Sequence, residues 1–142
     1  MIVVRLCTSD AEIEQAFSVR RAVFIEEQGV PESLEHDTDD ATAYHFLLTD
    51  ADSPIGAARL LRRNDTLGKV GRVAILATRR SGGLGRTLMD GIEAEARSHG
   101  FTHLYLHAQT PVVGFYERLG WQAEGDEFYE ADIPHYKMSK TL

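Results

Sequence analysis

The stretch from residue 69 to residue 99, KVGRVAILATRRSGGLGRTLMDGIEAEARSH, constrains the fold more than any other part of the chain. Apolar residues run almost without interruption from Val73 to Ala77, as is typical of a buried strand. A glycine-rich turn follows, and an apolar residue then recurs at every fourth position, at Leu84, Leu88, Ile92 and Ala96. Gly100 indicates where this helix ends. The sequence therefore predicts a strand, a glycine turn and a long helix, in that order.

Such a turn favours anion binding at the start of the helix. The first N–H groups of a helix have no intrahelical partners, and the helix dipole adds roughly half a positive charge there. Glycines let the backbone approach a phosphate closely and adopt positive φ angles without steric cost. Three arginines flank the turn, at Arg79, Arg80 and Arg86. We therefore expect this turn to bind a pyrophosphate.

The spacing of the turn residues distinguishes between phosphate-binding motifs. There is no G-x-x-x-x-G-K-[ST] run, and a dinucleotide fingerprint would need a small residue where Leu88 stands. It would also need an acid about 20 residues on, where the next predicted strand carries His103 and His107. The pattern that fits is R-x-x-G-x-G, at Arg80, Gly83 and Gly85. At these residues the chain resembles the GNAT N-acetyltransferase superfamily, whose members bind acetyl-CoA with this turn.

A second block strengthens the resemblance. Residues 115–121, FYERLGW, are similar to the family's F-Y-x-x-x-G-F, with Trp121 in place of the usual phenylalanine. The N-terminal half and two further short segments resemble the ElaA-like branch of the superfamily, in which acceptors are poorly defined. The residues that carry this closer similarity are Val23, Phe24, Glu27, Gln28, Glu35, Asp37, Asp40, His45, Ala108–Gln109 and Ile133–Pro134–His135.

The resemblance implies a set of cofactor-binding residues for acetyl-CoA, which enters as a co-substrate. Backbone groups of Val73, Ala74 and Ile75 would contact the pantetheine arm. The pyrophosphate would lie against Arg80, Ser81, Gly82, Gly83, Leu84, Gly85 and Arg86. Gly82 stands where many members carry a side chain, and the loop from His107 to Tyr116 is shorter than in relatives that place an asparagine on the cofactor. Gln109 is the candidate to replace that asparagine.

Acetyl transfer to an amine needs a polarised thioester carbonyl, a neutral amine and a protonated leaving thiolate. Tyr116 is the candidate catalytic acid, because a phenol is a hydrogen-bond donor whose ordinary pKa is about 10. The alternative is a tyrosine that only anchors the core. No base is assigned; the candidates are His107, His135, Glu26, Glu27 and an ordered water.

Seven acids lie between residues 26 and 40 without any lysine or arginine among them: Glu26, Glu27, Glu32, Glu35, Asp37, Asp39 and Asp40. Composition alone favours a solvated loop. The alternative is an acidic surface that attracts a cationic acceptor. Under this alternative the candidate acceptor-binding residues are Glu27 and Asp37, together with His107 and His135.

Charge argues against a general nucleic-acid binder. The chain carries a net charge of −7, yet the segment from Arg59 to Arg86 holds eight basic residues and one acid. An acidic protein with a basic segment around a glycine turn is typical of a protein that binds one discrete polyanion. The spacing of His99, His103 and His107 suits zinc ligands on a helix, but Gly100 interrupts that helix, so no metal is expected.

The remaining patterns predict one mixed α/β domain over residues 1–142. Strands are expected at 2–6, 44–49, 55–63, from 69 onward, 103–108, 121–123, 127–131 and 136–139. A helix should begin at a Ser9–Glu12 capping box and end near Gly29–Val30–Pro31, and a short helix should cover 113–119. This order describes a mixed, largely antiparallel sheet with helices on both faces, as the resemblance also implies.

Taken together, the sequence predicts an acetyl-CoA-dependent N-acetyltransferase that acts on a primary amine of a small acceptor. The alternative is a non-catalytic CoA-binding sensor or interaction domain on the same fold. No membrane span is expected. The single Cys7 suits a cytoplasmic location. The sequence is also compatible with a homodimer.

Overall fold

Seven strands form one sheet in the computed structural model, which describes all 142 residues. Their order across the sheet is β1-β2-β3-β4-β5-β7-β6, and every neighbouring pair is antiparallel except β4 and β5. The strands are β1 (Ile2–Leu6), β2 (Tyr44–Asp50), β3 (Ser53–Arg62), β4 (Leu67–Ile75), β5 (His103–Gln109), β6 (Gln122–Glu130) and β7 (Ile133–Thr141). The mixed, largely antiparallel sheet expected from the sequence is confirmed.

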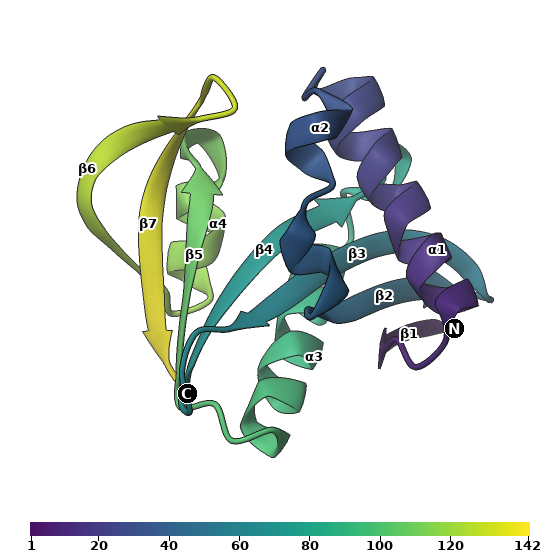
Figure 1. Cartoon of the computed structure of the whole chain (residues 1–142), viewed down its shortest axis with the longest axis horizontal. Coiled ribbons are helices and arrows are strands. Elements are labelled where there is room, and N and C mark those ends of the chain that lie inside the picture. Colours follow the sequence, from purple (N-terminus) through teal and green to yellow (C-terminus); the bar gives the residue numbers. More distant parts are fainter.

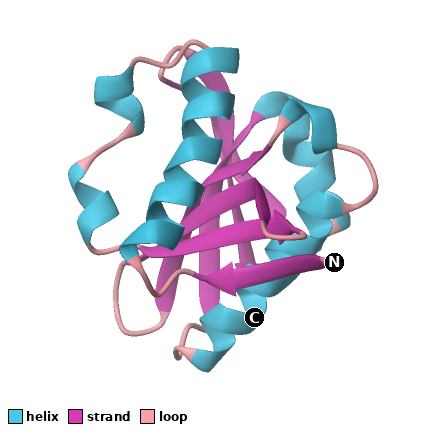
Figure 2. Ribbon diagram, turned by 90° about the vertical axis from the view of Figure 1, so that its right-hand side faces the viewer, coloured by secondary structure: helices cyan, strands magenta, loops and turns pink.

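Helices cover both faces of this sheet (Figures 1 and 2). The first, α1 (Asp10–Arg20), continues directly into the π-helical segment η1 (Arg21–Glu27). The long helix is α3 (Leu84–Ser98), and α4 (Val113–Arg118) precedes the last two strands. Short helical turns complete the chain: α2 (Glu32–Glu35), η2 (Thr38–Ala41), η3 (Ala77–Arg79) and η4 (Thr110–Val112). None of these helices combines the length and apolar character needed to cross a bilayer.

The core forms two layers because successive strand residues point to opposite faces of a sheet. On one face, Ala16, Val19 and Val23 of the first helical segment pack against Leu47, Ala57 and Ala74 of the central strands. On the other face, α3 supplies the side chains predicted from its four-residue repeat, and they pack against the central strands and β5. Gly91 of α3 lies so close to Val4 of β1 that an added Cβ would come within 2.5 Å of it.

Four local expectations need correction. The acidic segment contains α2 and η2 rather than irregular loop. Ser9 caps the N-terminus of α1, but the Glu12 carboxylate reaches the N–H of Thr8 instead of completing a capping box with Ser9. β6 is one continuous strand with an irregularity between Glu124 and Phe128, not two strands.

The fourth correction concerns α3. The four-residue apolar repeat leaves Glu93 outside the expected apolar face of this helix, but Glu93 is buried and pairs with Lys140 of β7 at 2.9 Å. A carboxylate at a core-facing position is therefore compensated by a lysine that sequence spacing does not reveal.

The parallel pairing of β4 with β5 is short. It extends only from Leu67 to Val70 on β4, where Val70 lies opposite Leu106. Beyond this point β4 pairs with β3 alone, and a bulge places Arg72 at a φ of 53°. Residues 71–75 of β4 and 107–109 of β5 thus diverge and do not pair with each other (Figure 1). We call these two unpaired stretches the fork.

Candidate active site

The glycine turn lies at the end of β4, immediately before α3. Gly82 and Gly83 have φ angles of 88° and 77°, in the left-handed region that favours glycine. A Cβ added at either position would meet no atom within 4 Å. Gly83 is the N-cap of α3, and no side chain caps the helix there. The first N–H groups of α3 therefore have no capping side chain, and the turn before them has free space, which fits a pyrophosphate.

Gly85 has a different physical role. A Cβ at this position would lie 3.0 Å from the ring of Phe115 on α4. A contact this short would force the ring to shift, so Gly85 lets α4 pack closely against the first turn of α3. The two sequence blocks that carried the family resemblance thus meet at this contact.

Only one of the three arginines around the turn has a guanidinium without a protein partner. Arg79 pairs with Asp50 at 2.6 Å. Arg80 donates two hydrogen bonds of 2.6 Å to Glu27 and a third to the carbonyl of Ile75. The guanidinium of Arg86, in the first turn of α3, makes no hydrogen bond or ion pair with another side chain or with the backbone.

Two consecutive residues at the end of η1 join the two sides of the fork. Glu27 accepts the bidentate hydrogen bond from Arg80, and these bonds lower the pKa of the Glu27 carboxyl. Gln28 accepts a hydrogen bond of 2.9 Å from the side-chain amide of Gln109, at the end of β5. We call this arrangement the Glu27–Gln28 bridge. It brings together Glu27, which the sequence predicts to bind the acceptor, and Arg80, which the resemblance implies for the cofactor.

The edge of β4 within the fork carries the predicted pantetheine contacts. Ala74 is buried, while Val73 and Ile75 pack partly buried against the larger core cluster. Backbone N–H and C=O groups of this stretch that point away from β3 have no strand partner, because β5 has diverged. Such groups can bind an extended ligand as an additional strand would.

Tyr116 lies on α4, on the same face of the sheet as α3. Its side chain is 6% exposed and packs against the rings of Phe115 and Trp121. No protein group hydrogen-bonds the hydroxyl. Burial raises the pKa of Tyr116 well above its ordinary value, so the phenol keeps its proton at neutral pH. The tyrosine therefore belongs to the core and also keeps a hydroxyl that can donate to a ligand.

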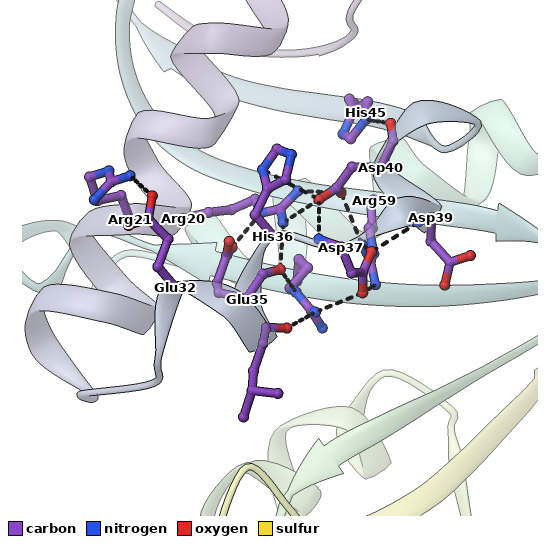
Figure 3. A network of polar contacts seen from close by, with 12 residues as sticks. Arg20, Arg21, Glu32, Glu35, His36, Asp37, Asp39, Asp40, His45 and Arg59 are labelled. Carbon is purple, nitrogen blue, oxygen red and sulfur yellow. Dashed lines mark hydrogen bonds and ion pairs between the residues drawn. The ribbon is translucent and has the colours of Figure 1, made fainter.

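The acidic segment is neither a solvated loop nor an unpaired acidic surface (Figure 3). Arg20 of α1, 1% exposed, donates to Glu35 at 2.6 Å and to Asp40 at 2.8 Å. Arg59 of β3 donates to Asp37 at 2.7 Å and to Asp40 at 2.9 Å. We call these side chains, together with Arg72, the arginine–carboxylate network.

Arg72 extends this network to the β4 bulge. Its guanidinium donates to the carbonyls of Leu34 and Glu35 and to the carboxylate of Asp37. Burial alone would raise the pKa of Asp40, but hydrogen bonds and charge from Arg20 and Arg59 outweigh burial and hold it far below its ordinary value. The hydrogen bond from Arg59 likewise lowers the pKa of Asp37. These carboxylates therefore stay charged and bound to arginine.

The two histidines predicted to contact the acceptor lie on neighbouring strands. Nδ1 of His107 is 2.7 Å from a carboxylate oxygen of Glu130, and the ring meets Phe128 edge-on. The ring of His135 stacks on that of Phe128, and its Nδ1 lies 2.7 Å from the carbonyl of Ile133. Sequence reasoning missed Phe128 and Glu130. No local pattern reveals them, because 23 residues separate Glu130 from His107.

Other hollows and clusters lie outside the fork. One hollow of about 370 Å³ lies against the outer side of α1 and α2, and one of about 390 Å³ lies at the His103 end of β5. No group of three or more His, Cys, Asp or Glu side chains is arranged to hold a metal ion.

Comparison with known proteins agrees with this geometry. The model of the acetyltransferase (GNAT) domain matches residues 7–142. A Bacillus subtilis (strain 168) protein named as an acetyltransferase is 39% identical over 140 residues, covering 96% of this chain and 95% of the relative.

Solved structures show the same similarity. An N-acetyltransferase structure from Lactobacillus plantarum superposes with a TM-score of 0.92 at 31% identity, covering 99% of this chain and 98% of the other. Escherichia coli ElaA superposes with a TM-score of 0.87 at 26% identity, covering 99% of both chains. An aminoglycoside 6′-N-acetyltransferase solved with coenzyme A shares the fold, with a TM-score of 0.74 at 18% identity over 98% of this chain and 96% of the other. The chain therefore belongs to the GNAT family of acetyltransferases and resembles its ElaA branch.

Proposed function

We propose that this protein is an acetyl-CoA-dependent N-acetyltransferase that moves the acetyl group directly to a primary amine of a small acceptor. The observation that carries the proposal is the free space at the N-terminus of α3 next to an unpaired edge of β4. A pyrophosphate and an extended pantetheine arm need these two features side by side. The coenzyme A in the solved aminoglycoside acetyltransferase supports the choice of cofactor.

Each part of the chain has a defined task in this proposal. The backbone of Val73, Ala74 and Ile75 binds the pantetheine arm. Backbone N–H groups from Ser81 to Arg86 bind the pyrophosphate, and the free guanidinium of Arg86 adds charge. Arg80 and Gln109 act through the Glu27–Gln28 bridge, which holds the turn after β4 and the end of β5 at a fixed separation.

The residues near the amine come from the side of the fork that η1 covers. Glu27, His107 and His135 remain the proposed acceptor-binding residues. Asp37 was the fourth candidate, but its carboxylate is bound by Arg59 and Arg72. We assign Asp37 instead to holding the acidic segment against the sheet.

Bond breaking in the thioester leaves a thiolate that needs a proton. Tyr116 can supply it, because its phenol stays protonated at neutral pH and no protein group competes for the hydroxyl. The buried ring keeps the hydroxyl in place, so little reorganisation accompanies the transfer.

Pyrophosphate binding by the glycine turn is tested by changing Gly83 in two ways. Asp and Asn are the non-glycine residues that best tolerate a left-handed backbone, and both can cap a helix. Gly83→Asp adds a negative charge where the pyrophosphate should lie, and Gly83→Asn is its matched uncharged control. Calorimetry should show CoA affinity lost in the Asp variant and reduced far less in the Asn variant, with similar thermal transitions. Equal CoA affinity in wild type and Gly83→Asp would refute the proposal that this turn binds the pyrophosphate.

Turnover distinguishes the enzyme from the alternative function. Thiol release from acetyl-CoA should appear with at least one member of a panel of small primary amines. A chain that binds CoA yet releases no thiol above the hydrolysis background with any amine would be a CoA-binding domain without transfer activity.

A further inference from the structure

His107 occupies a particular place in the fork. The last paired residues of β4 and β5 are Val70 and Leu106, so His107 is the first residue of β5 beyond the pairing. Leu106 and Ala108 belong to the core cluster under α3, and alternation therefore directs His107 to the opposite face. Gln109 lies on that same opposite face, where it meets Gln28 of the bridge. Tyr116 lies on the α3 face, so His107 and Tyr116 stand on opposite sides of the sheet at the fork.

The surroundings of His107 fix its protonation pattern. The Glu130 carboxylate is 2.7 Å from Nδ1, and the hydrogen bond from His107 lowers the pKa of Glu130. A charged carboxylate can only accept at this contact, so Nδ1 carries the hydrogen in the neutral ring. Nε2 has no protein partner and keeps its lone pair. The carboxylate at Nδ1 also fixes the orientation of the ring, as it does in catalytic triads.

We propose that His107 is the general base of the reaction and that Glu130 is its positioning residue; this inference rests on the proposed function. Nε2 takes a proton from the acceptor ammonium, which leaves a neutral amine. The nitrogen lone pair then forms the C–N bond to the thioester carbon, and the C–S bond breaks with its electron pair going to sulfur. The phenol of Tyr116 protonates the thiolate, and the second nitrogen proton passes through water to restore that phenol. The proton on His107 passes to solvent.

Two other candidate bases, His135 and Glu27, are less suited. His135 is 8% exposed, whereas the His107 side chain is 24% exposed. Its Nδ1 is bound to the carbonyl of Ile133, two residues before it in the chain. Glu27 is held by two hydrogen bonds from Arg80, which lower its pKa and make its carboxylate a poor base.

Several charged or titratable groups face the His107–Glu130 pair, which we call the dyad, and they enter its pH dependence. Lys137 lies opposite His107 on β7, and Tyr105 precedes it on the same face of β5. Lys69 of β4 lies opposite Tyr105, and the ring of His135 stacks on that of Phe128. The charges of Lys69 and His135 also act on Glu130. Two acids belong to this set: Glu130, which contacts His107, and Glu124 of β6, which pairs with Lys137 at 3.9 Å.

The first experiment compares His107→Gln with His103→Gln, its matched control. His103 is an exposed histidine on the same face of β5, and the one hydrogen bond of its ring is with Thr102. We expect His107→Gln to lower kcat roughly 10²-fold with an amine that is protonated at the assay pH, within the range for general bases. CoA affinity should not change, and an acceptor that is already neutral, such as a hydrazine, should lose far less. The acid limb of the pH–rate profile should disappear in His107→Gln and persist in His103→Gln.

The same loss with protonated and neutral acceptors would overturn the role of base and leave His107 a structural residue. Wild-type kcat in His107→Gln under conditions where chemistry limits the rate would also overturn it. Neither result would touch the proposed function, which fails only if wild type transfers acetyl to no amine.

The second experiment reads the dyad without turnover. Imidazole ¹⁵N spectra of wild type at neutral pH should show His107 with hydrogen on Nδ1 and none on Nε2. Glu130→Gln should lose this preference and show a mixture of tautomers, together with a smaller loss of kcat than His107→Gln. A wild-type spectrum with hydrogen on Nε2 would refute the dyad even if the enzyme is active.

Discussion

The acidic segment at residues 35–40 and the glycine turn at residues 81–86 are opposite solutions to the placement of charge. In the segment, three carboxylates face three arginines, and the charges compensate one another inside the fold. In the turn, the N–H groups of α3 have no capping side chain and Arg86 has no partner. The charged groups of the first region are paired without a ligand, whereas the second region has N–H groups and a guanidinium without partners.

The difference teaches that the density of charge in a sequence does not identify a binding surface. The segment with the most acids has its central carboxylates bound internally, and the turn with the most arginines keeps one guanidinium free. What distinguishes a ligand site is the group left without a partner, and pairing over long sequence distances decides which group that is.

The largest expected effect tests the completeness of the acidic segment. Asp40→Ala removes one carboxylate from both Arg20 and Arg59 while the guanidinium groups remain buried. Removing one partner of a buried ion pair costs about 3–5 kcal/mol, and we expect the lower end because Glu35 and Asp37 remain. Urea unfolding followed by circular dichroism measures the loss. Asp39→Asn is the control, because the Asp39 carboxylate makes no ion pair; a similar loss in both variants would argue against the network.

Tyr116→Phe tests the other side of the comparison, where function depends on a group with no partner. The ring is kept, so packing and CoA affinity should not change. Turnover should fall about 10²-fold, since general acids contribute about 10²–10⁴-fold and water can replace part of the effect. An acetyl thioester with a better leaving group should lose less. Undiminished steady-state turnover where chemistry is rate-limiting would exclude Tyr116 as the acid.

Acid should weaken the network before it weakens the turn. The pKa of Asp40 and that of Asp37 are lowered in the fold. Their stabilising contribution is therefore complete above the ordinary aspartate pKa of about 4 and decreases as the pH falls below it. The free energy of unfolding should decrease by about 1–2 kcal/mol between pH 5 and pH 3. In Asp40→Asn this decrease should be smaller; an equal decrease would assign the acid sensitivity to other carboxyls.

The smallest effect sharpens the view of the turn itself. Arg86→Gln removes the guanidinium that has no partner, and we expect CoA affinity to fall about 2–5-fold at low salt. Arg79→Gln is the matched control, because Arg79 is engaged with Asp50. Calorimetry at two salt concentrations should show a weaker salt dependence for Arg86→Gln than for wild type. A larger loss in Arg79→Gln would mean that the Asp50 pair opens to bind the ligand.

The strands and helices of this fold follow largely from local sequence. The four-residue apolar repeat places α3, and glycines mark its start and its end. Sequence reasoning failed where an element depends on distant partners. The segment from Glu32 to Ala41 folds into short helices because Arg20, Arg59 and Arg72 hold its carboxylates and carbonyls, and none of these arginines is near in sequence.

The candidate site divides along the same line. The turn residues from Ser81 to Arg86 and the Phe115–Tyr116 pair are recognisable from spacing. The bond between His107 and Glu130 is not, because it requires β5, β7 and β6 to lie side by side in that order. The pairing of Glu27 with Arg80 likewise joins residues 53 positions apart. Spacing therefore identifies the backbone that we propose binds the cofactor, but not the side chains that we propose surround the acceptor.

The Glu27–Gln28 bridge has a consequence for how this protein can diversify. Backbone hydrogen bonds fix the distance between paired strands, and no substitution can tune it finely. At the fork, side chains take over this task, through Glu27 with Arg80 and Gln28 with Gln109. Mutation can therefore widen or narrow the fork one residue at a time while the sheet stays intact. The fold thus offers an incremental evolutionary route to acyl donors of different size.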